Sequence, residues 1–507
     1  MRKRTAVIDI GSNSARLVIF EKTSHYGFHL ICEQKSKVRI AEGAYEKDGY
    51  LQPIGIKRAF LTLESFMQTI DKYQANKTLC VATSALRDAP NAKVFIRWIK
   101  KELGLSIKVI DGKQEAKYGA IAASNLLPVT NAISIDIGGG SSDIALMQEG
   151  NIIDTYSLDL GTVRLKELFF DKDDKSDVIY QKATAHIEHE LKSLPKHFKS
   201  ALAIGIGGTA RTLSKAIMKR SDYPLDKLHA FSYSIKEHQD YLEKIPLSSL
   251  KKLKKFKVKK NRHDTIREGT LIFNKILSHI EAKNVISSSV GVREGVFLEE
   301  LLKDDNQKFP SQINPSINSI LDRFRPLINI EKKRKSRLKI ATTLYSVLQS
   351  QVQDEMIHKK ELLYALKLSN IGKTLTIYKA HQHAFYIATQ ELNYGFTHKQ
   401  ILLISLLLRM YGKELLNKDL CERYQSLLPS NKIVSWLSFI YTLTVFLHEA
   451  SNAAKIGFTY NDDILTITSD KPLYLAKEKI KTIERPSNFL IIIKDENTLP
   501  KNKELGI

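Results

Sequence analysis

Two stretches of the chain bring together residue types that can bind phosphate, "VIDIGSNSARLVIF" (7–20) and "SIDIGGGSSDIALM" (134–147). In each, an aspartate (Asp9 or Asp136) is followed by glycines and small polar residues. Glycine lets a ligand approach the backbone closely, and successive N–H groups with hydroxyls can cradle phosphate oxygens. The repetition predicts a duplicated phosphate-binding unit. The small residues expected to bind phosphate are Gly11, Ser12, Asn13, Ser14, Gly138, Gly139, Gly140 and Ser141.

The residues on both sides of these turns alternate between apolar and polar, so each turn is expected to join two strands. This argues against a Walker loop or a dinucleotide fingerprint, which join a strand to a helix, and neither strict pattern occurs. A third small-residue turn lies in "GIGGTAR" (205–211) and predicts a far wall made by Gly207, Gly208 and Thr209. One such turn alone can be an ordinary hairpin. Three together resemble the actin-like phosphotransfer fold.

The elements that must position these turns alternate between strands and helices as far as about residue 302, which indicates α/β organisation. A polar segment with two prolines follows, then period-3.6 apolar spacing typical of helices, then strand patterns near the end. The predicted parts are lobe I (1–126), lobe II (127–302), a linker and first helix (303–330), a helical domain (331–455) and a β-containing tail (456–507).

The net charge of +23 is the most unusual bulk property of the chain. Such an excess attracts polyanions, although basic runs can also be solvated surface. Much of the charge lies in "KKLKKFKVKKNRH" (251–263) and "EKKRKSRLK" (331–339). Three scattered cysteines and a start without signal-peptide character predict a reducing, cytoplasmic location. No membrane segment is expected.

An ordered set of strings resembles the exopolyphosphatase and guanosine pentaphosphate phosphatase (Ppx/GppA) family: "DIGSNSARL", "ATSALRDAPN", "DGKQEAKYGA", "IDIGGGSSD", "LDLGTVRLKELF", "IGIGGTARTL" and "VGVREGVFLEEL". The resemblance implies a duplicated actin-like (ribonuclease H-like) ATPase fold with two lobes around a cleft. It also implies hydrolysis of terminal phosphate from inorganic polyphosphate or guanosine pentaphosphate, with Mg²⁺ as cofactor. We expect a homodimer and neither a specific nucleic acid nor a membrane as partner.

The resemblance assigns roles to single residues. It implies that Glu115 is the general base that activates the attacking water, although a carboxylate in the first turn of a helix can instead be a simple cap. Arg16 and Arg87 match phosphate-binding positions, with surface ion pairs as the alternative. Glu294 in the "REG" string is interpreted as a contact at a helix start.

Magnesium is expected at Asp9, Asp136 and Asp143, since Mg²⁺ takes few carboxylates together with water and phosphate oxygens. The sequence departs from the family here. Asp143 stands where the family has a longer glutamate, and Gln114 stands where it has an acidic residue before the catalytic glutamate. A sensor that binds polyphosphate or an alarmone without hydrolysing it is therefore an alternative, as is an actin-fold kinase.

The helical region resembles the HD-type domains of longer family members, but Ser369, Asn370 and Gly412 stand where metal-binding residues are expected. We therefore predict a degenerate HD-like domain without a metal, in which His381 and His383 are packed or face solvent. Its remaining role would be to extend a basic groove that holds a long polyanion.

Overall fold

The computed structural model describes residues 3–44, 47–170, 176–324, 334–352, 357–411, 416–450 and 454–495. It divides into two compact units. The first consists of Met1–Ser319 with Asn393–Thr397, and the second of Ile320–Leu392 with His398–Ile507. Among the described residues, no helix combines the length and the apolar character needed to cross a membrane.

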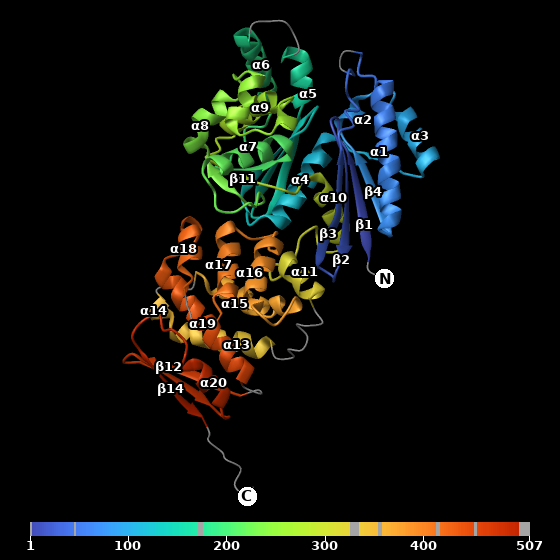
Figure 1. Ribbon diagram of the computed structural model, residues 1–507. Helices are drawn as coiled ribbons and strands as arrows, with labels where there is room; N and C mark the ends of the chain where they lie inside the picture. The colour runs from blue at the N-terminus through green and yellow to red at the C-terminus, as the bar shows by residue number, and fades with distance from the viewer. Residues whose placement is uncertain are drawn as a thin grey trace, which may run out of the picture. The chain divides into compact units, whose positions relative to one another are not determined.

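The first lobe is built on a five-stranded sheet in the order β3-β2-β1-β4-β5 (Figure 1). Its first two strands form the predicted antiparallel hairpin, in which Asp9 lies opposite Arg16 and the Gly11 N–H donates to the Ser14 carbonyl (3.1 Å). The strands are β1 (Arg4–Ile10), β2 (Ala15–Lys22), β3 (Phe28–Ser36), β4 (Lys77–Ala82) and β5 (Lys108–Val109). The helices are α1 (Pro53–Lys72), α2 (Ser84–Asp88), α3 (Ala92–Leu103) and α4 (Gly112–Leu126).

The second lobe repeats this plan with a six-stranded sheet in the order β10-β11-β9-β6-β7-β8. Its hairpin has the register of the first: Asp136 lies opposite Asp143, and the Gly138 N–H donates to the Ser141 carbonyl (2.9 Å). The strands are β6 (Ala132–Ile137), β7 (Ser142–Gln148), β8 (Asn151–Leu158), β9 (Leu202–Ile206), β10 (Ser232–Ser234) and β11 (Asn284–Ser287). The helices are α5 (Thr162–Leu165), α6 (Ser176–Leu191), α7 (Gly207–Arg220), α8 (Ile235–Lys244), α9 (Ile266–His279) and α10 (Val292–Leu301).

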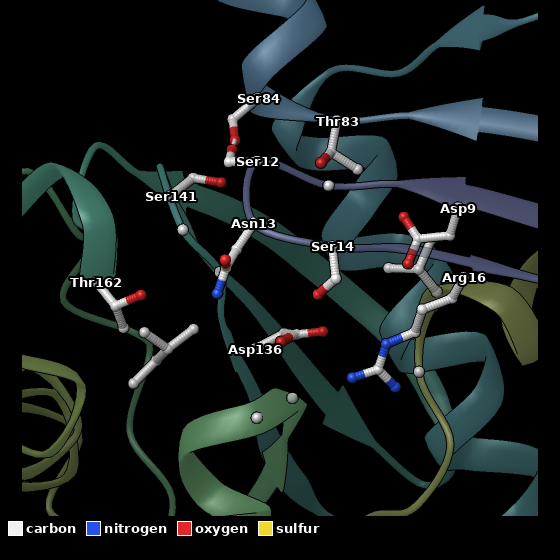
Figure 2. Close-up of a pocket in the computed structure, with 18 of the residues that line it drawn as sticks. Asp9, Ser12, Asn13, Ser14, Arg16, Thr83, Ser84, Asp136, Ser141 and Thr162 are labelled. Carbon is white, nitrogen blue, oxygen red and sulfur yellow. Dashed lines mark hydrogen bonds between the residues drawn. The ribbon is translucent and has the colours of Figure 1, made fainter. Parts of the chain in front are cut away.

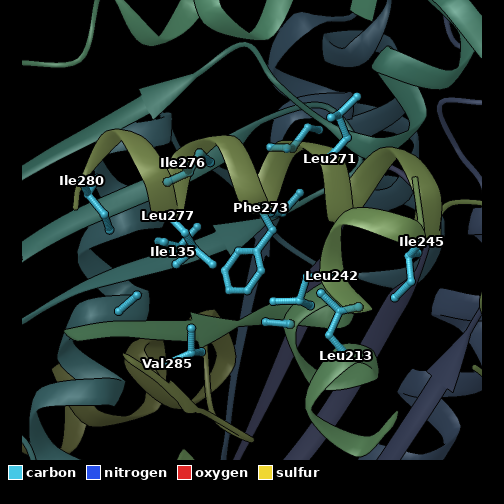
Figure 3. Packing of buried hydrophobic residues seen from close by; sticks show 14 of the residues in the cluster. Ile135, Leu213, Leu242, Ile245, Leu271, Phe273, Ile276, Leu277, Ile280 and Val285 are labelled. Carbon is cyan, nitrogen blue, oxygen red and sulfur yellow. The ribbon is translucent and has the colours of Figure 1, made fainter. Parts of the chain in front are cut away.

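The core of the second lobe lies between its sheet and α9. Figure 3 shows Phe273, Ile276 and Leu277 of α9 facing Ile135 and Val285 of the strands. These side chains are almost completely buried, so each contributes nearly all the stabilisation that burial of its own apolar surface can give. This core fixes the sheet whose strand ends carry the second hairpin and the start of α7.

Helices α4 and α10 connect the two lobes. The buried alanines Ala116, Ala120 and Ala123 of α4 pack in a cluster with residues of the second sheet, whereas Phe297 of α10 stacks on Phe20 of the first sheet (ring centroids 4.3 Å apart). Each lobe is thus covered by a helix that belongs to the other half of the repeat. The two helices touch backbone to backbone, since a Cβ on Gly295 would lie 2.0 Å from the Tyr118 carbonyl oxygen.

The segment after α10, predicted as a linker, packs against the lobes. Asn125 donates to the carbonyl of Gln307 (2.9 Å) and accepts from the N–H of Phe309 (3.0 Å). A second segment, Asn393–Thr397, returns to the same unit from between two helices of the other one. Its Gly395 N–H donates to the Leu126 carbonyl at the end of α4 (2.8 Å).

Tyr394 in this returning segment contacts both lobes. Its ring stacks on Phe28 of β3 and meets His229 of the second lobe edge to face, with ring centroids 5.7 Å apart in each case. Residues 393–397 therefore fill the seam between the lobes.

The second unit is mainly helical and ends in a three-stranded sheet of order β12-β13-β14. The elements are α11 (Pro315–Arg323, which crosses the division), α13 (Arg334–Val347), α14 (Gln349–Val352), α15 (Lys359–Leu368), α16 (Ala380–Glu391), α17 (His398–Arg409), α18 (Lys418–Arg423), α19 (Asn431–Ala450), β12 (Ile456–Asn461), β13 (Ile464–Ser469), α20 (Tyr474–Ile480) and β14 (Leu490–Asp495). Of the positions compared with HD-type domains, Gly412 lies outside the described residues. The HD-like assignment stays a prediction.

Candidate active site

A pocket of about 150 Å³ lies where the two hairpin turns meet. Figure 2 shows Ser12, Asn13 and Ser14 of the first turn together with Asp136 and Ser141 of the second. The lining residues are Asp9, Gly11, Ser12, Asn13, Ser14, Arg16, Lys35, Thr83, Ser84, Glu115, Asp136, Ile137, Gly138, Gly139, Ser141, Thr162, Gly207, Gly208, Arg211, Arg262, Thr265, Gly291, Val292 and Arg293.

The two hairpin turns face each other at close range. A Cβ on Gly139 would lie 2.9 Å from Cβ of Ser12, so no larger residue fits at position 139 without movement. The Ser12 hydroxyl is held in place by a hydrogen bond with the Ser84 hydroxyl (2.9 Å). The small residues of the turns thus permit the approach of the lobes that forms the pocket.

Helices α7 and α10 are among those that begin at the pocket wall, which favours anions there because helix N-termini carry partial positive charge. Helix α7 starts at Gly207, whose φ of +77° is the left-handed region that favours glycine. Helix α10 starts after Gly291, whose N–H donates to Glu294 (2.7 Å). Glu294 therefore caps the start of α10, as predicted.

Glu115 lies in the first turn of α4, where Asp111 caps the helix by accepting from the Gln114 N–H (2.7 Å). Its side chain is 12% exposed and its Oε2 lies 3.5 Å from Nη1 of Arg87. That oxygen is buried and accepts no hydrogen bond from the described residues. Burial raises the pKa of Glu115 well above its usual value, and the charges of Asp143, Asp136 and Asp9 add to the shift.

The three predicted metal-binding aspartates have different positions. Asp9 and Asp136 line the pocket, and burial raises the pKa of both, that of Asp9 to about 6. Asp143 lies behind the lining, where it accepts from the hydroxyls of Ser157 (2.6 Å) and Ser141 (3.3 Å). Burial raises the pKa of Asp143 to about 7. Its shorter side chain is bound to hydroxyls of its own lobe, so it does not reach the pocket.

Five basic side chains face these carboxylates: Arg16, Lys35, Arg211, Arg262 and Arg293. Burial, followed by the neighbouring arginines, lowers the pKa of Lys35 to about 8 and that of Arg211 to about 10. Burial would also lower the pKa of Arg293, but the carboxylates of Glu294, Glu33 and Asp9 raise it overall. A bound anion would reduce the repulsion between these crowded positive charges.

Most residues proposed from the sequence lie together in this pocket. Three phosphate-binding candidates do not line it. Arg87 lies behind Glu115 and donates to the Ile110 carbonyl (3.1 Å), Gly140 packs near Gly161, and Thr209 is buried against Gly269. The pocket residues that were not predicted from the sequence are Lys35, Thr83, Ser84, Ile137, Thr162, Arg211, Arg262, Thr265, Gly291, Val292 and Arg293. Arg211 stands inside one of the family strings and Arg262 inside the basic run 251–263, and these were the available signals.

The oxygen donors suit a hard divalent cation. Mg²⁺ binds through one or two carboxylates together with water and phosphate oxygens. Asp9 and Asp136 supply two such carboxylates, and desolvation makes their ionised forms unfavourable until positive charge is near. Within the described ranges, no three His, Cys, Asp or Glu side chains form a ready metal-binding group. The donors present fit Mg²⁺ at a site shared with phosphate.

Comparison with curated proteins finds relatives that are named as a phosphatase or a pyrophosphatase. The chain is 25% identical over 478 residues to the guanosine-5'-triphosphate,3'-diphosphate pyrophosphatase of Pseudoalteromonas translucida, covering 91% of each protein. It is 31% identical over 310 residues to a bifunctional 3-dehydroquinate synthase/phosphatase of Fusobacterium nucleatum. That match covers 58% of this chain and only 46% of the relative, so the chain spans less than half of its length.

Solved structures agree in fold. The crystal structure of the Aquifex aeolicus member of the Ppx/GppA family is similar with a TM-score of 0.52 at 29% identity, over 60% of this chain and 99% of that one. The crystal structure of an exopolyphosphatase from Cytophaga hutchinsonii is similar with a TM-score of 0.55 at 23% identity, over 59% of this chain and 98% of that one. This similarity supports the fold alone. The model of the Ppx/GppA phosphatase family matches residues 18–304, which are more than half of the sequence. The chain therefore belongs to the Ppx/GppA phosphatase family.

Proposed function

We propose that this chain hydrolyses the terminal phosphoanhydride bond of inorganic polyphosphate and, as a second substrate, of guanosine pentaphosphate. The observation that carries the proposal is the buried Oε2 of Glu115, which accepts no hydrogen bond from the described residues, in a pocket formed by two phosphate-cradle turns and five cations. Family membership and the activity named for the Pseudoalteromonas relative support the same reaction class.

In this mechanism the terminal phosphate lies between the hairpin turns, with Ser14 and Asn13 on one side and Ser141 on the other. Arg16 and Arg211 balance the charge of its oxygens. Glu115 Oε2 holds a water in line with the terminal phosphorus and takes its proton as the new P–O bond forms and the bridging P–O bond breaks. The shortened chain leaves with the bridging oxygen, and the proton passes from Glu115 to solvent.

Arg87 supports this step without touching substrate. Its guanidinium is fixed by the Ile110 carbonyl and lies 3.5 Å from Glu115, so its charge opposes the rise in the carboxylate pKa. We propose Mg²⁺ as cofactor, held by Asp9 and Asp136. When bound, it would supply positive charge that neutralises the phosphoryl oxygens and keeps these carboxylates ionised.

A binding role without turnover is a second candidate, favoured by the position of Asp143 behind the pocket wall. Of the three aspartates predicted to bind Mg²⁺, only Asp9 and Asp136 line the pocket, so one carboxylate fewer is available to a metal ion. Such a sensor would bind polyphosphate through the same turns and cations but would release no phosphate.

The test measures phosphate release from polyphosphate and from guanosine pentaphosphate by the full chain, with Mg²⁺ and with a chelator. Glu115→Gln should lower kcat by about 10²- to 10⁴-fold, the usual contribution of a general base, while the Kd for polyphosphate is retained. Glu64→Gln, an exposed glutamate on α1, is the matched control. Wild-type turnover in the Glu115→Gln variant would contradict the catalytic role, and binding without any release would favour the sensor.

A further inference from the structure

Residues 250–262 form a lysine-rich surface segment that is firmly anchored in the second lobe. Its two short 3₁₀ turns are Leu250–Phe256 and Lys260–Arg262. Leu253 and Val258 are buried in the core, and the Tyr241 hydroxyl donates to the Phe256 carbonyl (2.6 Å). The segment is therefore held by apolar packing and by a side-chain hydrogen bond to its backbone.

All seven lysines of this segment are exposed: Lys251, Lys252, Lys254, Lys255, Lys257, Lys259 and Lys260. None of them forms an ion pair with any residue in the described part of the chain. Leu253 and Val258 face inward, whereas Leu250 at the start of the segment is 51% exposed, and all seven lysines are presented to solvent. Seven positive charges within ten residues repel one another unless an anion neutralises them.

The segment ends in the pocket of the candidate active site. Arg262 lines that pocket and packs over the start of α7, since a Cβ on Gly208 would lie 2.7 Å from its Nη2. Lys259 is three residues earlier, so its Cα lies within about 11 Å of that of Arg262. On the other side, Lys37 of the first lobe donates to the Asn261 carbonyl (3.2 Å). The lysines thus lead directly to the edge of the pocket.

We propose that this lysine segment binds the part of a linear inorganic polyphosphate chain that extends out of the pocket, and so makes long chains the preferred substrate. The proposal rests on the proposed function, in which the terminal phosphates of the same chain occupy the pocket. Guanosine pentaphosphate carries its charges in compact groups, so it gains little from lysines outside the pocket.

The segment suits a phosphate chain better than a nucleic acid. Binding of single-stranded nucleic acid usually combines basic residues with aromatic side chains on which bases stack. The aromatic residue here, Phe256, packs against Tyr241 with ring centroids 5.7 Å apart. Lysines without an exposed ring can neutralise a row of phosphates but offer no platform for bases.

The decisive variant carries Lys252→Gln, Lys254→Gln, Lys255→Gln and Lys259→Gln together in the full chain. Its matched control replaces four exposed lysines of α1 and α3, Lys57, Lys72, Lys93 and Lys100, by glutamine, with the same change in net charge. The ratio of the KM for long-chain polyphosphate to that for tripolyphosphate should rise at least tenfold in the segment variant only. An equal rise in both KM values, or the same ratio in both variants, would overturn the proposal.

Binding is measured separately in the Glu115→Gln background, so that this proposal and the proposed function can fail independently. For long-chain polyphosphate, the slope of log Kd against log salt concentration should be smaller in the segment variant than in its parent. The decrease should be up to about 3 for the four lysines, if each contributes as it does in binding single-stranded nucleic acid. Absence of binding in the parent, or lysine-dependent binding of single-stranded DNA of equal affinity, would overturn the proposal. If the wild-type protein releases no phosphate, that result would contradict the proposed function and not the proposal about the lysine segment.

Discussion

Gly207→Ala is predicted to damage the site through one contact. Gly207 is the first residue of α7 and has a φ of +77°. A Cβ added there would lie 2.2 Å from Oδ1 of Asp136, whereas ordinary van der Waals contact begins at about 3.4 Å. The carboxylate would have to retreat by about 1 Å.

Two costs follow, and they can be separated. Holding alanine in the left-handed region costs about 1–2 kcal/mol of folding stability wherever it occurs. Displacing Asp136 by about 1 Å should in addition lower kcat by about 10²-fold, because reacting groups tolerate little misplacement. Gly104→Ala is the control, since Gly104 also has positive φ (+64°) but a Cβ there would meet nothing within 4 Å.

The assay combines urea unfolding with kcat for phosphate release from tripolyphosphate. Gly207→Ala should lose at least as much free energy of unfolding as Gly104→Ala, because only the former must also relieve the contact with Asp136, and only Gly207→Ala should lose activity. If the two variants have equal kcat, Asp136 does not need its present position and the assignment of the pocket is wrong.

Two further predictions concern charge and packing. Because burial and neighbouring arginines lower the pKa of Lys35 to about 8, this amine loses its proton as the pH rises through that value, so kcat/KM should fall above about pH 8. Lys35→Arg keeps its charge and should remove that alkaline fall; an identical pH profile in the two proteins would exclude Lys35 as its cause. Tyr394→Ala removes two ring contacts at the seam and should lower the free energy of unfolding by about 1–3 kcal/mol, as for a partly buried aromatic residue. Urea unfolding checks this against Tyr378→Ala, a tyrosine that is 77% exposed, and equal losses would contradict the packing role.

The sequence was informative about the fold because its signals are local. The alternation in 7–20 and 134–147 specifies antiparallel hairpins, and the small residues between the strands leave little choice of turn. Repetition of that pattern identifies the duplicated fold. The position of Glu115 followed in the same way from a helix start and a family string, and the structure adds the Asp111 cap.

The rest depends on contacts between distant segments. Nothing in the sequence distinguishes Lys35 from the other lysines and arginines, which number 78 in all, and it reaches the pocket only because β3 is placed beside β2. Asp143 was expected at the pocket from its spacing. Its partner Ser157 lies on a neighbouring strand, and that pairing decides where the carboxylate points.

Residues 393–397 have a consequence for attempts to divide the protein. A fragment that stopped near residue 319 would keep every strand of both lobes, yet it would lose the tyrosine packed on Phe28 and the Gly395 amide that donates to the Leu126 carbonyl beside His229. The Aquifex structure covers only 60% of the present chain, although 99% of its own chain is matched. A shorter homologue is therefore not a guide to where the present chain can be divided. Chimaeras that exchange the C-terminal half should carry this five-residue stretch as part of the N-terminal half.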